Sequence, residues 1–156
     1  NHSNQALELL DNPSKSEQEI LSAIKYQKND ILLHVDDSIL PQRKAVWSSW
    51  NFLLDSESDK PVALTYNMNI LQNLKCKKTL CVTLNSKDQI DKNKILKKIV
   101  YYHPLFTVDS LKAQSRKNEI NGKNNSYFCG AYWRNGFHED GVVSALDVCK
   151  KFGESL

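Results

Sequence analysis

The stretch Thr79-Leu80-Cys81-Val82-Thr83-Leu84 carries the clearest strand pattern of the chain. Its β-branched and apolar residues alternate, with neither glycine nor proline among them, and this favours an extended backbone over a helix. Residues 61–67 and the aromatic, apolar run 45–54 predict two more strands, paired across the polar and solvated loop 55–60. We therefore expect an antiparallel meander sheet in the middle of the chain.

The segments around this sheet carry helical spacing or short apolar runs. Residues 4–10 predict a short helix that Pro13 ends, and Ser16 with Glu19 predicts a capping box for a second helix. The run 31–35 is bounded by polar residues and predicts a buried strand. Further expected elements are a helical turn or two at 69–74, a helix at 108–118, a turn at 121–125, a strand at 127–129 and a last helix from about 140 to 152.

The segment 95–102 fits two structures. Its apolar residues Ile95, Leu96, Ile99 and Val100 have helical spacing, whereas Tyr101-Tyr102 in front of a proline indicates an extended chain entering a turn. Periodicity alone leaves both open.

Composition narrows the class of protein. At 156 residues, 40% of them hydrophobic and 25% charged, the chain can bury one sizeable core. The net charge of +3, from 21 basic and 18 acidic side chains, is too small to indicate nucleic-acid binding. No apolar run reaches the roughly twenty residues of a membrane-spanning helix, and no secretion-signal pattern opens the chain, so we expect a cytoplasmic protein. The lysines Lys92, Lys94, Lys97 and Lys98 indicate a solvated face, or a basic patch that would make the protein peripheral to a membrane.

Cysteine and histidine spacing argues against a metal site. The cysteines Cys76, Cys81, Cys129 and Cys149 contain no C-x-x-C pair and stand in apolar or strand-like runs, which predicts buried free thiols. His138-Glu139 lacks the second histidine of a zinc-protease helix. For His34 and His103 a hydrogen-bonded structural role is the simpler interpretation. We expect no metal ion.

The segment from Tyr127 to Leu146 is the most informative for function. It shows a strand, a loop with Gly130 and Gly136, and a helix that we expect to begin after Gly141. The first N–H groups of a helix lack internal partners and favour negative charge, such as the charge of a reduced flavin near its N1 and C2 carbonyl. The alternative is an ordinary junction between a loop and a helix, with Trp133 and Phe137 in the core.

The same segment resembles the C-terminal flavin-contacting motif of bacterial FAD-dependent amine-oxidase-like oxidoreductases, an NAD/FAD-binding protein family. The match comprises Gly130-Ala131-Tyr132-Trp133, Gly136 to Val142 and Ser144-Ala145-Leu146. Shorter matches follow the same order along nearly the whole chain, among them Leu33-His34-Val35-Asp36, Trp47-Ser48-Ser49-Trp50-Asn51, Thr65-Tyr66-Asn67-Met68-Asn69, Tyr102-His103-Pro104 and Ala113-Gln114.

This resemblance implies an FAD-dependent oxidoreductase that oxidises a substrate C–H bond by hydride transfer to the flavin. It implies as cofactor-binding residues Gly130, Ala131, Tyr132, Trp133, Gly136, Phe137, His138, Glu139, Asp140, Gly141 and Val142. Two features depart from the family. The five glycines cannot form the G-x-G-x-x-G turn that holds the FAD pyrophosphate. Ala131 and Tyr132 stand where many amine oxidases carry an acidic residue after the glycine.

The expected fold class is α+β: an antiparallel substrate-domain sheet with flanking helices, and a C-terminal strand and helix that complete a missing FAD-binding domain. Residues 1–25 would end a strand of that domain and add connecting helices, 26–108 would form the sheet, and 109–156 would return with the flavin-capping helix. The chain opens at Asn1 and its only methionine is Met68, so we expect a missing N-terminal nucleotide-binding domain and an inactive fragment.

The aromatic residues of the sheet allow two interpretations. Trp50, Tyr66, Met68 and His103 are candidates for an apolar pocket that binds a small-molecule, lipid-like substrate, yet Trp47, Trp50, Tyr66 and Met68 fit core residues better. The alternative function is a stand-alone, non-catalytic binding module derived from the substrate domain. A metal-dependent hydrolase is a third and weaker alternative.

Overall fold

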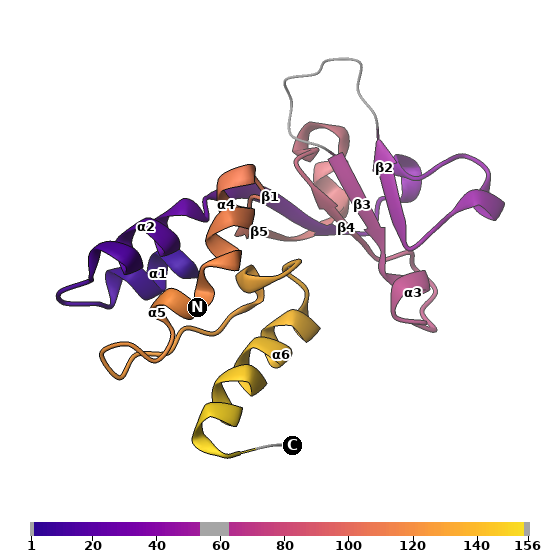
Figure 1. The fold of residues 1–156 in the computed structure, drawn as a ribbon. Helices are drawn as coiled ribbons and strands as arrows, with labels where there is room; N and C mark the ends of the chain where they lie inside the picture. Colours follow the sequence, from indigo (N-terminus) through magenta and orange to yellow (C-terminus); the bar gives the residue numbers. More distant parts are fainter. Residues whose placement is uncertain (1, 54–62, 155–156) are drawn as a thin grey trace. The chain divides into compact units, whose positions relative to one another are not determined.

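The computed structural model describes residues 2–53 and 63–154, so the predicted loop 55–60 and the role predicted for Asn1 lie outside the described residues. The chain divides into two compact units. The sheet unit is Lys28–Tyr102, and the helical unit joins Asn1–Gln27 to His103–Leu156. The structure mixes helices and strands, as the α+β class predicts, and each unit is described by itself (Figure 1).

The sheet unit is built on five antiparallel strands in the order β2-β3-β4-β1-β5 (Figure 1). The strands are β1 (Tyr26–His34), β2 (Trp50–Leu53), β3 (Ala63–Asn67), β4 (Cys81–Leu84) and β5 (Ile95–Pro104). The expected meander is right for β2, β3 and β4, which are consecutive in both chain and sheet. The strand β1, the first in the chain, is not part of that expectation and is inserted between β4 and β5.

The strand limits correct two expectations and decide the structure of a segment that the sequence left open. The strand predicted at 45–54 is only β2, because a 3₁₀ turn at Lys44–Val46 and a loop occupy its first half. The strand predicted at 31–35 extends back to Tyr26. The segment 95–102, for which the sequence allowed a helix or an extended chain, is extended as part of β5. Pairing within the sheet therefore decides its structure, and the periodicity of its apolar residues does not. The helical turn or two predicted at 69–74 is confirmed as a short helix, α3 (Met68–Leu71).

The two faces of the sheet have opposite chemistry. Residues directly opposite one another on paired strands share a face. On one face the register forms two rows of side chains across β2, β3, β4 and β1. The first row is Trp50, Tyr66, Val82 and Leu33, and the second row is Phe52, Leu64, Leu84 and Ile31. We call these eight residues the apolar face. On the other face Asn67, Cys81 and His34 are aligned beside Asn51, Thr65, Thr83 and Leu32, and we call these seven the polar face.

The polar face is the one that the sheet unit buries. His34, Thr83, Thr65 and Asn67 are almost completely buried, whereas Trp50 and Phe52 at the end of the apolar face are 44% and 59% exposed. The expectation that Trp50 is a core residue is therefore wrong. Tyr66 and Met68 are only partly buried.

A hydrogen-bond chain explains how polar side chains can be buried there. The Asp36 N–H donates to His34 Nδ1 at 3.1 Å, so the other ring nitrogen, Nε2, carries the proton and donates to Thr83 Oγ1 at 2.7 Å. Thr83 Oγ1 is in turn 2.8 Å from Thr65 Oγ1. Burial lowers the pKa of His34 below its ordinary value, against the opposing charge of Asp36. The prediction that His34 is a hydrogen-bonded structural residue is confirmed.

The carboxylate of Asp36 continues this network. Burial by itself would raise the pKa of Asp36, but hydrogen bonds from the Asp91 N–H (2.9 Å), Lys94 Nζ (2.9 Å) and Ser38 hold the pKa far below its usual value. Asp36 thereby ties the end of β1 to the 3₁₀ turn Lys92–Lys94 that precedes β5. Lys94 is therefore an ion-pair partner, although its side chain is still 43% exposed, and Lys92, Lys97 and Lys98 are exposed, as a solvated face predicts.

Five helices form the framework of the helical unit. They are α1 (Ser3–Glu8), α2 (Lys15–Ala23), α4 (Val108–Ser115), α5 (Lys117–Ile120) and α6 (His138–Cys149). The core packs Ile20 and Leu21 of α2, and Ile24 directly after this helix, with Ala113, Ile120, Phe128, Tyr132 and Trp133. The helix predicted at 108–118 is divided into α4 and α5.

The N-terminal part of the helical unit corrects two further predictions. Helix α1 begins at Ser3, where the sequence indicated the tail of a strand. The capping box is Ser14 with Glu17, two residues before the predicted pair: Ser14 Oγ accepts from the Glu17 N–H at 3.3 Å, and Glu17 Oε2 accepts from the Ser14 N–H at 2.7 Å. Both pairs match the S-x-x-E pattern, and the earlier pair follows Pro13 directly.

Thiols, metal clusters and membrane helices can be assessed for the described part of the chain. All four cysteines are free, as predicted, but only Cys81 is buried, while Cys76, Cys129 and Cys149 are exposed. The described residues contain no cluster of three or more potential metal ligands. Within residues 2–53 and 63–154, every helix is too short or too polar to span a bilayer.

We predict that the sheet unit loses stability when the pH falls from 7 to 5, and that His34 causes much of the loss. His34 in the unfolded chain binds a proton near its ordinary pKa of about 6.5, whereas the buried ring resists protonation, so the unfolded state binds more protons in this window. Urea unfolding followed at the Leu32 and Cys81 NMR signals measures the slope. His34→Gln should flatten it, and the exposed His138→Gln should not. Equal slopes in all three proteins would contradict this assignment.

Candidate functional site

The candidate site is the segment from Gly130 to Val142, which we call the loop–helix segment. It consists of Gly130, a 3₁₀ turn at Ala131–Trp133, a loop, and the first turn of α6 (Figure 1). Two sequence predictions fail here. Tyr127-Phe128-Cys129 forms no strand among the described residues, although a β-bridge pairs Lys123 with Ser126 just before it. Helix α6 begins at His138, so Gly141 lies within its first turn and not in front of it.

The inner side of the segment is anchored by side chains from other helices. Gln114 of α4 donates from Nε2 to two backbone carbonyls of the segment, Tyr132 O at 2.9 Å and Arg134 O at 2.7 Å. Ser144 of α6 accepts through Oγ from the Gly130 N–H at 3.1 Å. These bonds hold the backbone on both sides of the 3₁₀ turn.

The approach to the segment is fixed in the same way. Asn121 forms a pair of bonds with Phe128: its Oδ1 accepts from the Phe128 N–H at 2.6 Å, and its Nδ2 donates to Phe128 O at 3.3 Å. Phe128 O also accepts from Trp133 Nε1 at 2.9 Å. The Asn121 side chain thus satisfies the backbone N–H and C=O of Phe128, which a neighbouring strand was expected to do. The stretch around Phe128 therefore needs no strand partner at this residue.

The aromatic pair at the centre of the segment belongs to the core. Tyr132 and Trp133 are 4% and 6% exposed, and their ring centroids lie 5.0 Å apart. Burial raises the pKa of Tyr132 far above its ordinary value, so its hydroxyl stays protonated at neutral pH. In this chain these two side chains face the core, and a ligand could reach these positions through the backbone only.

The outer side of the segment is exposed. Phe137 is 57% and Val142 49% exposed, and the intervening His138 and Glu139 are also on the surface. The first intrahelical bond of α6 joins the Gly141 N–H to Phe137 O at 3.2 Å, so the amides of His138, Glu139 and Asp140 precede it. Asp140, which is buried, accepts from the Phe137 N–H at 3.0 Å and caps this end.

Gly136 is required by the backbone of the loop. Its φ of +87° lies in the left-handed region, and a Cβ there would lie 3.5 Å from Phe106 Cζ and 3.7 Å from Pro104 Cγ. The bend places Phe137 at the N-cap of α6. Gly141 differs, because its backbone is helical and a Cβ would lie at an ordinary 3.9 Å from Ala131.

The predicted substrate residues do not all come together. Trp50 and Tyr66 are opposite one another on β2 and β3 and meet edge to face, with centroids 5.4 Å apart. Met68 follows at the start of α3. His103 belongs to the helical unit and is exposed. The sheet unit therefore unites only Trp50, Tyr66 and Met68.

Residue-by-residue reasoning missed the anchors Gln114, Asn121 and Ser144. Each of these side chains bonds to a backbone group 7 to 20 residues away in the chain, and no local spacing signals such a contact. Gln114 and Ser144 do fall within the family resemblance, which was the one available signal.

Neither a scan against protein-family models nor a search of curated proteins finds a match for this chain.

Two glycine substitutions should have opposite effects on stability. Gly136→Ala places an L side chain at φ +87° and should destabilise the helical unit by about 1 kcal/mol. Gly141→Ala, inside α6, should stabilise it by roughly 0.5 kcal/mol because alanine favours the helix. Urea unfolding of the two variants and the parent measures both changes. If Gly141→Ala were as destabilising as Gly136→Ala, the helix start at His138 would be wrong.

Proposed function

We propose that this chain is the C-terminal part of an FAD-dependent oxidoreductase related to the flavin amine oxidases. Its helical unit would contribute the loop–helix segment to flavin binding, and its sheet unit would contribute a substrate-binding surface. The observation that carries the proposal is the two-sided construction of the loop–helix segment: Gln114, Asn121 and Ser144 fix its inner side, and Phe137, His138, Glu139 and Val142 are exposed on its outer side.

The exposed start of α6 suits the anionic edge of an isoalloxazine ring. The amides of His138, Glu139 and Asp140 precede the first intrahelical bond, and the aligned peptide dipoles favour negative charge at this end. The carboxylates of Glu139 and Asp140 lie in the same turn and oppose this effect. Asp140 is committed to the Phe137 N–H, so the amides rather than the side chains would receive the charge of the ring.

Exposed Phe137 at the N-cap of α6 and exposed Val142 in the helix supply apolar surface near its start. A flat aromatic ring loses water from both of its faces when it binds, so apolar side chains next to polar amides are suitable neighbours. When bound, the flavin would accept a hydride from a substrate C–H bond and later pass two electrons to oxygen or another acceptor. The share of this chain is to bind the ring, orient it and exclude water.

The sheet unit supports an apolar substrate. Its apolar face runs across four strands without a charged residue, and it ends at the exposed side chains of Trp50 and Phe52. We propose that the substrate contacts this face, with Trp50, Tyr66 and Met68 as the aromatic and thioether contacts. A lipid-like substrate fits this surface better than a highly charged one.

Nucleotide binding requires a domain that we propose lies outside these 156 residues. The glycines at 122, 130, 136, 141 and 153 form no G-x-G-x-x-G turn. An in-frame upstream continuation encoding that turn would support the flavoenzyme. A start codon directly before Asn1, with a purified gene product that carries no flavin, would overturn it in favour of a non-catalytic binding module.

Substitutions on the outer side of α6 should lower flavin retention without affecting folding. In the full-length gene product, Phe137→Ala and Val142→Ala should each reduce the flavin that remains after gel filtration, because both remove apolar contact area. Leu111→Ala is a matched control, since Leu111 is 55% exposed on α4 of the same unit. All three should unfold within about 0.5 kcal/mol of the parent. Equal flavin retention in all three would count against the assigned surface.

The 156-residue chain by itself should bind FAD weakly or not at all, because it has no turn to hold the pyrophosphate. Fluorescence titration with FAD tests this, and riboflavin, which lacks the pyrophosphate, is the comparison ligand. Tight stoichiometric binding of FAD would show that the chain is a complete flavin site and would refute the division into two domains.

A further inference from the structure

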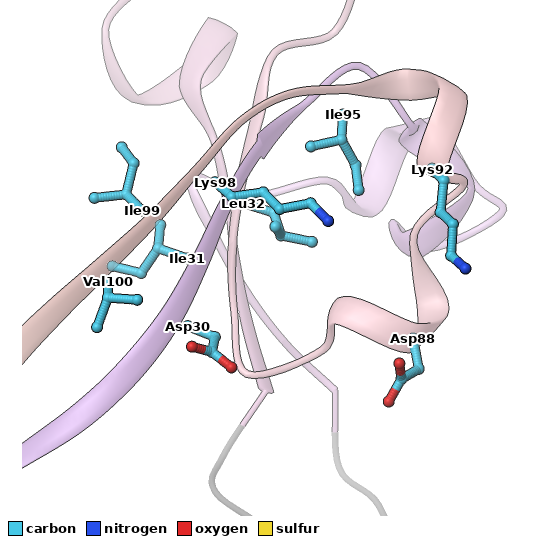
Figure 2. A pocket seen from close by; sticks show the side chains of 9 residues that line it. All are labelled: Asp30, Ile31, Leu32, Asp88, Lys92, Ile95, Lys98, Ile99 and Val100. Carbon is cyan, nitrogen blue, oxygen red and sulfur yellow. The ribbon is translucent and has the colours of Figure 1, made fainter.

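A cavity of about 390 Å³ lies in the sheet unit, and its lining shares Ile31 with the apolar face and Leu32 with the polar face. It is bordered by β1, β5 and the 3₁₀ turns at Lys87–Gln89 and Lys92–Lys94 (Figure 2). Cavities of roughly 300–1,000 Å³ are typical of sites for small molecules. The flavin proposal does not use this cavity, and the substrate contacts proposed at Trp50, Tyr66 and Met68 are not among its lining residues.

The lining of the cavity is amphipathic. Aliphatic side chains supply its floor: Ile31, Leu32, Ile95, Ile99 and Val100. Four charged side chains supply its rim: Asp30, Asp88, Lys92 and Lys98. A ligand that fills it must therefore combine an apolar body with a charged or polar end.

The arrangement of the charges indicates the sign of that end. Figure 2 shows Lys98 extending past Leu32 and below Ile95, with its ammonium directed into the open space. Among the residues that the structure describes, neither Lys92 nor Lys98 has a carboxylate partner, whereas Lys94 of the same segment is bound to Asp36. The free positive charge therefore lies with Lys92 and Lys98.

The acidic residue Asp88 would orient the ligand. Asp30 is held in the fold, with its N–H donating to Asn85 Oδ1 at 3.2 Å. The carboxylates of Asp30 and Asp88 lie on the side of the cavity away from Ile95 (Figure 2). Asp88 would repel an anion from that side and leave Lys98 as its contact. Ile31, Ile99 and Val100 lie together on the side of Lys98 away from its ammonium, where an alkyl tail would contact them (Figure 2).

We propose that this cavity binds a small alkyl carboxylate, with the carboxylate on Lys98 and Lys92 and the chain on Ile31, Ile99 and Val100. The ligand is a free carboxylate and not a bilayer, because a cavity of about 390 Å³ has the size of a small-molecule site. The site is independent of flavin binding.

Titration of the full chain with octanoate, followed by methyl NMR, tests the site. Saturable shifts should appear at Ile31, Ile95, Ile99 and Val100, and octylamine, which has the same chain and the opposite charge, should bind more weakly. No saturable shift at these methyls, or equal binding of octylamine, would overturn the proposal.

Three variants test the role of charge. Lys98→Met keeps the length of the side chain but removes the charge, and should weaken octanoate binding about three- to tenfold. Lys98→Arg should retain most of the affinity. Lys97→Met is the matched control, since Lys97 is the adjacent exposed residue of β5 and does not line the cavity. An equal loss in Lys97→Met would show a non-specific effect of charge and refute the site, and unchanged melting temperatures confirm that the variants fold.

Discussion

The sheet depends on the hydrogen-bond chain that runs from the Asp36 N–H through His34 and Thr83 to Thr65. Buried polar groups without partners are costly, so a sheet can turn a polar face inward only when each group is satisfied. Here three strands contribute one member each, and the chain closes only in the observed register, with His34 on β1, Thr83 on β4 and Thr65 on β3. A slip of one residue would turn every member to the opposite face. The network therefore fixes register and orientation together, and Asp36 extends it to the turn before β5.

This choice of inner face determines what the sheet presents outside. Once Thr65, Thr83 and His34 face inward, the alternation of β-strands directs Tyr66, Val82 and Leu33 to the other face. The buried side is stabilised by hydrogen bonds, and the apolar side keeps surface that has lost only part of its contact with water. An apolar surface left in this state is unusual for a chain that folds for stability alone, and it is the physical basis for assigning the substrate contact to this face.

The sequence predicts the kinds of element well and their environment poorly. The alternation in Thr79–Leu84 correctly indicates a strand, but it would ordinarily turn Leu and Val inward, and only the contact between His34 and Thr83, 49 residues apart, reverses this. The order of the strands in the sheet could not be predicted from the sequence either. The strand β1 lies between β4 and β5, and no local sequence pattern indicates these pairings. At the candidate site, the glycines correctly mark a tight loop, yet Gly141 could not be distinguished from Gly136. Only Gly136 has a left-handed backbone, while Gly141 is an ordinary helical residue.

In the loop–helix segment, the residues that hold the fold differ from the exposed residues that we propose bind the flavin. The groups that hold it are Gln114, Asn121 and Ser144, all bonded to backbone atoms, together with the buried rings of Tyr132 and Trp133. None of these contacts requires an aromatic ring at Phe137 or a β-branched residue at Val142, and both side chains remain mostly in water. The chain holds two apolar side chains and the amides that precede the first intrahelical bond of α6 close together in sequence, and this supports the proposed surface for a flat ligand with an anionic edge.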